Sequence, residues 1–195
     1  FRSQMNFKLF FTDEKNKDQI NRLVNKERIS KLDDSLFQSC SIERPQLQNG
    51  PDDPLYIYFT SGSTGTPKGI LGRYSGLLHF IKWELSTFKP NSNYRTSQFV
   101  TPSFDAFLRD TFLPLCAGAT LCIPDDQEIV LSGEQLVNWI DTNRIDLIHC
   151  VPSLFKLILS GELDSDNFKD LKYILMSGER INPIDLERWY AIFSD

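Results

Sequence analysis

A segment rich in glycine and hydroxyl side chains, Thr60–Gly69 (TSGSTGTPKG), carries the residue types best suited to binding a chain of phosphates. Its glycines permit a close approach of the backbone to a ligand and a positive φ. Its hydroxyl groups, its backbone N–H groups and the ammonium of Lys68 attract anionic oxygens. The preceding residues, Leu55–Phe59, are aromatic and β-branched and predict a buried strand. We therefore expect a phosphate-binding loop at the end of a strand.

This loop is not a Walker A motif, because Pro67 precedes Lys68 and Gly69 follows it, where the Walker motif requires Ser or Thr. A flexible Gly/Ser linker is the other interpretation of such a composition. A linker is not expected between a hydrophobic strand and an amphipathic helix, and apolar spacing predicts such a helix at Tyr74–Phe88. The binding loop is therefore the favoured interpretation.

The order Thr-Ser-Gly-Ser-Thr-Gly-x-Pro-Lys-Gly resembles the signature of the adenylate-forming superfamily. That superfamily includes the adenylation domains of nonribosomal peptide synthetases, the acyl-CoA synthetases and the luciferases. Two further parts of the sequence are similar to core motifs of the peptide-synthetase domains. The first is Phe104–Ala106 followed by Phe112–Leu121, and the second is Leu171–Ile181, where Ser-Gly-Glu stands for the usual Gly-Gly-Glu. Tyr74 stands where the family commonly has a histidine, so the two departures concern the substrate class more than the nucleotide.

Local patterns predict the order of the elements. Before the loop, a strand is expected at residues 8–12, a surface helix at 13–25 and a short strand near 36–40. After it, strands are expected at residues 95–100, 119–123, 146–150 and 172–176, and helices at 74–88, 104–116, 132–143, 152–160 and from Pro183. Ser103 and Ser132, the latter with Gln135, are the expected N-caps, and Gly118 is the expected helix terminator. Asp125, Asp126 and Glu128 are interpreted as a solvated turn.

Strands and helices alternate from Leu55 onward, which predicts an α/β fold with mostly parallel sheets flanked by helices. The resemblance implies part of the large N-terminal subdomain of an adenylate-forming enzyme. Residues 1–54 are interpreted as the end of a preceding subdomain and a connection, and residues 55–195 as the nucleotide- and substrate-binding core. The loop, Phe104–Asp105, His149–Cys150 and Ser177–Glu179 all follow expected strand ends, where such sheets bind ligands.

The resemblance implies that a carboxylic acid, in the first place an amino acid, attacks the α-phosphorus of ATP to give an acyl adenylate and pyrophosphate. The phosphopantetheine thiol of a carrier protein then takes the acyl group. Lys68 and Thr60 are the expected catalytic residues. Nucleotide binding is assigned to Thr60, Ser61, Gly62, Ser63, Thr64, Gly65, Thr66, Lys68, Gly69, Gly178 and Glu179. Mg²⁺ is implied, with most of its ligands outside this sequence, which looks like a piece of a longer enzyme and is expected to be inactive alone.

The same resemblance assigns the substrate residues. Asp105 would hold the α-amino group, and Phe104 would lie near the reacting carboxylate. The side-chain pocket would be formed by Ala106, Arg109, His149, Leu175 and Ser177. The alternative role for Asp105 is that of an aspartate at a helix N-terminus, stabilised by the helix dipole.

Two interpretations of Arg109 stay open. It could receive a polar or acidic substrate side chain with help from His149. It could instead pair with Asp105, four residues earlier on the same helix face, which would open the site to keto or hydroxy acids. An acyl-CoA ligase is disfavoured by Asp105, and an inactive adenylation-like platform that only docks its neighbours is the remaining alternative.

Composition limits the other possibilities. The 195 residues carry a formal net charge of −5 and no basic run, which disfavours a nucleic-acid partner. No apolar run approaches the ~20 residues of a membrane span, so no membrane partner is expected. The four cysteines form no C-x-x-C pair and there are two histidines, so we expect buried free thiols and no metal site. Free thiols fit a reducing cytoplasm, and a cytoplasmic protein is expected. The expected partners are the acid, a peptidyl carrier protein, neighbouring synthetase domains and the remainder of the adenylation domain.

Overall fold

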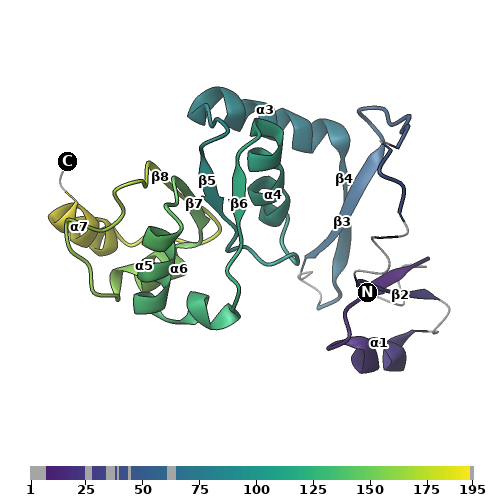
Figure 1. Ribbon diagram of the computed structural model, residues 1–195, viewed down its shortest axis with the longest axis horizontal. Helices are drawn as coiled ribbons and strands as arrows, with labels where there is room; N and C mark the ends of the chain where they lie inside the picture. Colours follow the sequence, from purple (N-terminus) through teal and green to yellow (C-terminus); the bar gives the residue numbers. More distant parts are fainter. Residues whose placement is uncertain are drawn as a thin grey trace. The chain divides into compact units, whose positions relative to one another are not determined.

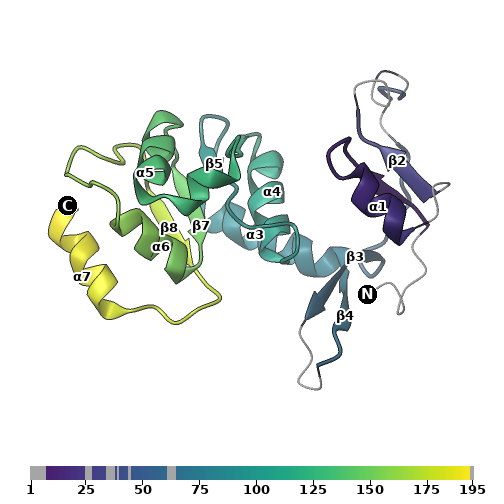
Figure 2. The ribbon, with the colours of Figure 1, turned by 90° about the horizontal axis from the view of Figure 1, so that it is seen from below.

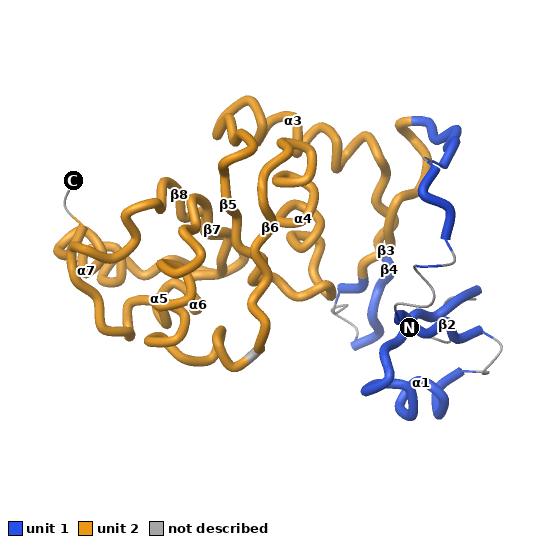
Figure 3. The backbone as a smooth tube through the Cα atoms, in the orientation of Figure 1, with its two compact units in different colours: residues 1–50, 59–69 blue, residues 51–58, 70–195 orange. Residues whose placement is uncertain are grey.

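The computed structural model describes residues 8–24, 28–33, 38, 40–43, 45–60 and 65–193. The chain forms two compact units, residues 1–50 with 59–69 and residues 51–58 with 70–195 (Figure 3). No helix in the described part of the chain is long and apolar enough to cross a membrane. The boundary expected between residues 54 and 55 stays a prediction.

The first unit contains a small parallel pair of strands, β1 (Phe10–Thr12) and β2 (Ile29–Lys31), joined through helix α1 (Lys17–Leu23). A strand and a helix were expected in this order, at residues 8–12 and 13–25. β2 was not expected, because three residues are too few for a recognisable alternation. The short strand expected at residues 36–40 lies mostly outside the described residues.

Strand β3 (Pro54–Thr60) follows the sequence prediction and pairs with β4 (Lys68–Arg73). β4 was missed, because its glycines lower strand propensity. One of those glycines is required by packing, since a Cβ on Gly72 would lie 2.0 Å from the ring of Tyr56. The loop between the two strands contains the predicted phosphate-binding segment.

The main sheet has four parallel strands in the order β6-β5-β7-β8 (Figure 1). They are β5 (Arg95–Ser97), β6 (Thr120–Cys122), β7 (Leu147–Cys150) and β8 (Tyr173–Met176). All four were expected at these places, and the parallel α/β class is confirmed. Because the strands are parallel, their carboxyl ends lie along one edge of the sheet.

Five α-helices of the described second unit flank these strands, with α3 before β5 and α7 after β8. They are α3 (Tyr74–Phe88), α4 (Ala106–Ala117), α5 (Gly133–Thr142), α6 (Pro152–Leu159) and α7 (Pro183–Ile192).

 Helices α6 and α7 each begin with a proline. Proline suits the first turn of a helix because the backbone N–H that it lacks would have no acceptor within the helix there. The side chain of Ser132 caps α5 by accepting from the N–H of Gln135, as the capping-box pattern predicted. α4 ends at Gly118, whose φ of 70° favours glycine. It begins two residues later than expected, so Asp105 and not Ser103 occupies its N-cap position.

The connection between β6 and α5 also differs from expectation. The acidic residues there were interpreted as a solvated turn, and the structure forms a 3₁₀ helix over Gln127–Leu131. The side chain of Asp126 begins it by accepting from the N–H of Glu128, which explains one of these acidic residues as a cap.

Helices cover both faces of the sheet, because the side chains of β7 belong to two apolar clusters that involve different helices. Ile148 and Cys150 belong to one apolar cluster, which is completed mainly by α5, α6 and α7. Leu147 belongs to a second cluster with Ile81 of α3 and Leu113 of α4. α3 and α4 lie side by side, as do α5 and α6 (Figure 2). Since successive side chains of a strand point to opposite faces, His149 lies on the same face as Leu147, toward α3 and α4.

Candidate functional site

A cavity of about 420 Å³ lies where the carboxyl ends of β5, β7 and β8 meet the start of α4. We call it the strand-end cavity. It is lined by Phe99, Val100, Thr101, Phe104, Asp105, Ala106, Arg109, Cys150, Val151, Leu154, Ser177, Gly178 and Glu179. The sequence predicted a ligand site at the carboxyl ends of the strands, and a cavity does lie at that edge of the sheet.

The turn after β8 forms one wall of this cavity. Gly178 has a φ of 87°, a conformation that favours glycine. The carboxylate of Glu179 accepts hydrogen bonds from the backbone N–H of Ser153, at 2.9 Å, and from its hydroxyl, at 3.0 Å. Ser153 lies in the first turn of α6, so Glu179 caps this helix and holds the turn against it. Glu179 was expected to bind the nucleotide, and Ser153 was not singled out from the sequence.

The start of α4 forms another wall. Phe104 is 66% exposed, and the side chain of Asp105 is exposed and makes no capping hydrogen bond. Within the described residues, Asp105 has no ion pair with a cationic side chain. Burial, and to a smaller extent the Asp105 carboxylate, raises the pKa of Tyr58, so Tyr58 lies within electrostatic range of Asp105. Asp105 is thus a carboxylate at the cavity wall with no cationic side chain paired to it, and such a carboxylate is suited to binding a cationic group of a ligand.

Arg109 also lines the cavity, but its charge is directed elsewhere. Its Nε lies 3.7 Å from Glu84 Oε1 and 3.8 Å from Asp110 Oδ1. Its guanidinium carbon lies 5.6 Å from the centre of the Phe80 ring, a cation–π distance. The i,i+4 pair with Asp105 that the spacing allowed is absent from the ion pairs of the described residues.

His149 completes a buried cluster with these groups. Its Nδ1 lies 2.8 Å from Asp110 Oδ1 and its Nε2 lies 3.2 Å from Glu84 Oε1. The side chains of Glu84 and Asp110 are 0% exposed, and that of His149 is 1% exposed. Burial raises the pKa of Asp110, while His149 and Arg109 beside it act in the opposite direction. We call Glu84, Arg109, Asp110 and His149 the charged quartet.

Two residues expected in the side-chain pocket do not line the strand-end cavity. His149 is enclosed in the charged quartet, and Leu175, its partner in the β7–β8 register, packs against the cluster around Leu147. Phe104, Asp105, Ala106, Arg109 and Ser177 do line it. The sequence analysis did not identify Glu84 and Asp110 as residues near the site. The only signal in the sequence was that Asp110 directly follows Arg109.

Cys150 lines the cavity without being a nucleophile. Its burial, and to a smaller extent the charge of Asp110, raises the pKa of its thiol to about 12. The thiol is therefore protonated at neutral pH. Cys116, Cys122 and Cys150 are free thiols, as expected, and the last two are buried. The expected burial is wrong for Cys116, because it lies on an exposed side of the last turn of α4. No group of three or more His, Cys, Asp or Glu side chains suited to a metal ion occurs in the described part of the chain.

The predicted nucleotide loop belongs to the first unit. Thr60 ends β3 and Lys68 begins β4, and both side chains are exposed. Gly65 has a φ of 77°, the backbone freedom for which a glycine was expected. Ser61, Gly62, Ser63 and Thr64 lie outside the described residues. A glycine with positive φ followed three residues later by an exposed lysine fits a polyphosphate ligand. The binding roles of the loop stay predictions.

Comparison with known proteins places these features in a family. A family model described as AMP-binding enzyme matches residues 5–195. The chain is 35% identical over 138 residues to the hybrid PKS-NRPS synthetase TAS1 of Pyricularia oryzae, covering 71% of this chain and 8% of that protein. It is 30% identical over 170 residues to tyrocidine synthase 3 of Brevibacillus parabrevis, covering 82% of this chain and 3% of that protein. The chain thus spans a small fraction of these relatives.

Solved structures share the fold. The nonribosomal peptide synthetase FmoA3 (S1046A) in its AMPPNP-bound form matches with a TM-score of 0.81 at 23% identity, over 94% of this chain and 19% of that one. The inhibitor-bound N-terminal domain of FACL13 from Mycobacterium tuberculosis matches with a TM-score of 0.78 at 19% identity, over 94% of this chain and 48% of that one. At these identities the likeness shows the fold.

Proposed function

Because the chain belongs to the family of AMP-binding enzymes, we propose that it is part of an adenylation domain that activates an amino acid with ATP. The acid becomes an acyl adenylate and pyrophosphate is released. The acyl group then passes to the phosphopantetheine thiol of a carrier protein. Peptide synthetases at about 30% identity support this reaction, and FmoA3 in its AMPPNP-bound form supports a nucleotide in this fold.

One observation carries the choice of an amino acid. Asp105 lies on the wall of the strand-end cavity, exposed and without an ion pair among the described residues. A carboxylate facing a substrate ammonium forms a charge-assisted hydrogen bond, which is stronger than a neutral one. Arg109, which could have occupied Asp105, contacts Glu84 and Asp110 instead. Asp105 is thereby left to bind the α-amino group.

The chain's own residues have separable tasks in this proposal. Lys68 and the hydroxyl and N–H groups of Thr60–Gly69 bind the phosphates and stabilise the charge that develops on the leaving pyrophosphate. ATP supplies the reactive phosphorus, and Mg²⁺ adds charge neutralisation. Phe104 and Ala106 shape the wall near Asp105, and the turn of Ser177–Glu179 forms another wall. The contribution of the protein is positioning and electrostatic stabilisation.

Exchange of labelled pyrophosphate into ATP, measured with the full-length protein, tests this function. Matched amino, keto and hydroxy acids are compared, and we expect exchange with the amino acids. Lys68→Ala should slow the exchange, whereas Lys82→Ala on α3 serves as a lysine control outside the loop. Preference for keto or hydroxy acids would contradict the role of Asp105. Absence of exchange with every acid would favour the inactive platform.

A further inference from the structure

The charged quartet combines groups from three elements that are far apart in the sequence. Glu84 comes from α3, Arg109 and Asp110 come from α4, and His149 comes from β7. All four lie on the face of the sheet that α3 and α4 cover. Among them, Arg109 alone also lines the strand-end cavity, with 16% of its side chain exposed. The quartet therefore connects the interior of the protein to the cavity through this one side chain.

The charges of the quartet explain why Arg109 is needed there. Two carboxylates removed from water require compensating positive charge, and Arg109 supplies one such charge. One further proton, on His149 or on a carboxyl group, brings the total charge to zero. In either case the charge of Arg109 is already matched by acids of the protein. A substrate carboxylate would enter as an additional negative charge beside a nearly water-free cluster.

The remainder of the cavity wall is compatible with an uncharged ligand. Phe99, Val100, Val151 and Leu154 are apolar, and the thiol of Cys150 is protonated. Glu179, the one further acid at the wall besides Asp105, is hydrogen-bonded to Ser153. Asp105 is left as the charged group suited to an ammonium.

We propose that Glu84 and Asp110 are positioning residues that hold and neutralise Arg109, so that the strand-end cavity selects amino acids with uncharged side chains. This inference rests on the proposed function and specifies its substrate class. Under this proposal, neither of the two interpretations of Arg109 left open by the sequence is correct. The arginine is not the receptor of an acidic side chain, and it does not occupy Asp105. The quartet keeps it beside the cavity with its charge already compensated.

Substrate selectivity tests this proposal in the full-length protein. Pyrophosphate exchange is measured with the matched pair glutamine and glutamate, and with the apolar methionine of similar length. The unaltered protein should favour the better of the two neutral acids over glutamate by at least about tenfold in kcat/KM, a difference of about 1.4 kcal/mol. Glu84→Gln and Asp110→Asn each free positive charge on Arg109, so each should shift the ratio toward glutamate by about tenfold.

A matched control separates selectivity from stability. Asp146 is also buried, and its Oδ1 pairs with Lys172 Nζ at 2.5 Å, away from the strand-end cavity. Asp146→Asn should lower the thermal midpoint while leaving the ratio of glutamate to neutral acids unchanged. A purely structural role of the quartet would give Glu84→Gln the same behaviour as this control.

The outcomes distinguish the two proposals. Exchange that favours glutamate in the unaltered protein, or a ratio unmoved in both quartet variants, overturns this inference and leaves the proposed function intact. If no acid supports exchange, the proposed function fails, and calorimetric binding of the glutaminyl and glutamyl sulfamoyl-adenosines tests the cavity directly. Tighter binding of the glutaminyl compound supports the inference, and equal, reversed or absent binding overturns it. If neither quartet variant folds, the same calorimetric comparison on the unaltered protein decides.

Discussion

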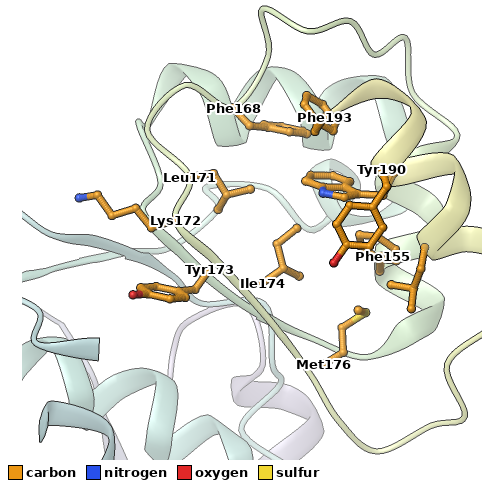
Figure 4. A pocket seen from close by; sticks show the side chains of 11 residues that line it. Phe155, Phe168, Leu171, Lys172, Tyr173, Ile174, Met176, Tyr190 and Phe193 are labelled. Carbon is orange, nitrogen blue, oxygen red and sulfur yellow. The ribbon is translucent and has the colours of Figure 1, made fainter. Parts of the chain in front are cut away.

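Two cavities of nearly equal size lie in the second unit and have different walls. The strand-end cavity has a volume of about 420 Å³, and a second one, the aromatic cavity, has about 400 Å³. The aromatic cavity lies beside β8, α6 and α7 (Figure 4). It is lined by Phe155, Phe168, Leu171, Lys172, Tyr173, Ile174, Met176, Leu186, Trp189, Tyr190 and Phe193.

The two cavities differ in whether their charged side chains are already paired within the protein or are available to a ligand. In the aromatic cavity the ammonium of Lys172 pairs with Asp146, and the rings contact one another, with Phe168 stacked on Trp189 at 5.7 Å. In the strand-end cavity Asp105 has no such pair among the described residues, while Arg109 is held by acids behind it. Equal volume therefore does not mean equal chemistry. We expect the aromatic cavity to govern stability and the strand-end cavity to govern specificity.

Removing an aromatic side chain should produce the largest effect. Phe155 is 2% exposed and lies 5.4 Å from Trp189 between ring centres. Phe155→Ala should lower the free energy of unfolding by about 3–5 kcal/mol, because it removes contacts and leaves a void. Thermal unfolding measures the loss. Below the transition, KM for the amino acid should stay unchanged, and a selective rise in KM would argue against the division of roles between the cavities.

Neutralising Asp105 should produce the next largest effect, and we expect this effect on activity and not on stability. Asp105→Asn removes the proposed partner of the substrate ammonium, which should cost about 2–5 kcal/mol in kcat/KM for the amino acid. Tyr190→Phe removes one polar atom from the aromatic cavity and should leave exchange unaltered. Similar losses in the two variants would show that Asp105 has no special role.

The turn of the strand-end cavity should respond more weakly. Glu179→Ala removes the cap of α6, which should cost about 0.5–2 kcal/mol of stability. Ser153→Ala keeps the backbone bond to Glu179 and should cost less. Because both changes loosen the wall near Ser177, KM for the acid should rise in both variants. A rise in KM for ATP alone would instead support the nucleotide role expected for Glu179.

The pH dependence of stability provides the finest test of the quartet. Burial raises the pKa of Asp110 in the folded protein above the value of about 3.9 in an unfolded chain. The stability associated with this shift is present in full below the unfolded pKa and is lost as the pH rises through the folded pKa. The stability of the unaltered protein relative to Asp110→Asn should therefore fall as the pH increases from about 4. Urea unfolding at a series of pH values measures this, and an opposite slope would contradict a buried acid.

Local signals in the sequence were sufficient for most of the fold. The apolar spacing of Tyr74–Phe88 predicted α3 at its observed bounds. The capping residue Ser132 and the terminating Gly118 were also found where expected, because each acts on its own neighbours. The succession of strand ends indicated where the strand-end cavity would lie. β4 was missed, since the need for Gly72 arises from the ring of Tyr56 and not from its sequence neighbours.

The charged quartet could not be found in this way. A glutamate within a helix is normally assigned to the solvent face, and the burial of Glu84 depends on residues of α4 and β7. The family resemblance placed His149 in the pocket, but the alternation of side chains along β7 directs it toward α3 and α4 instead. Local periodicity predicts which segments form, whereas the pairing of distant charges requires the assembled sheet.

A crystal structure of the full-length protein with a non-hydrolysable aminoacyl-adenylate analogue tests the central claim most directly. We predict density for the aminoacyl part in the strand-end cavity, with its ammonium about 2.7–2.9 Å from a carboxylate oxygen of Asp105. An analogue seated in the aromatic cavity, or an ammonium bound away from Asp105, would contradict the account.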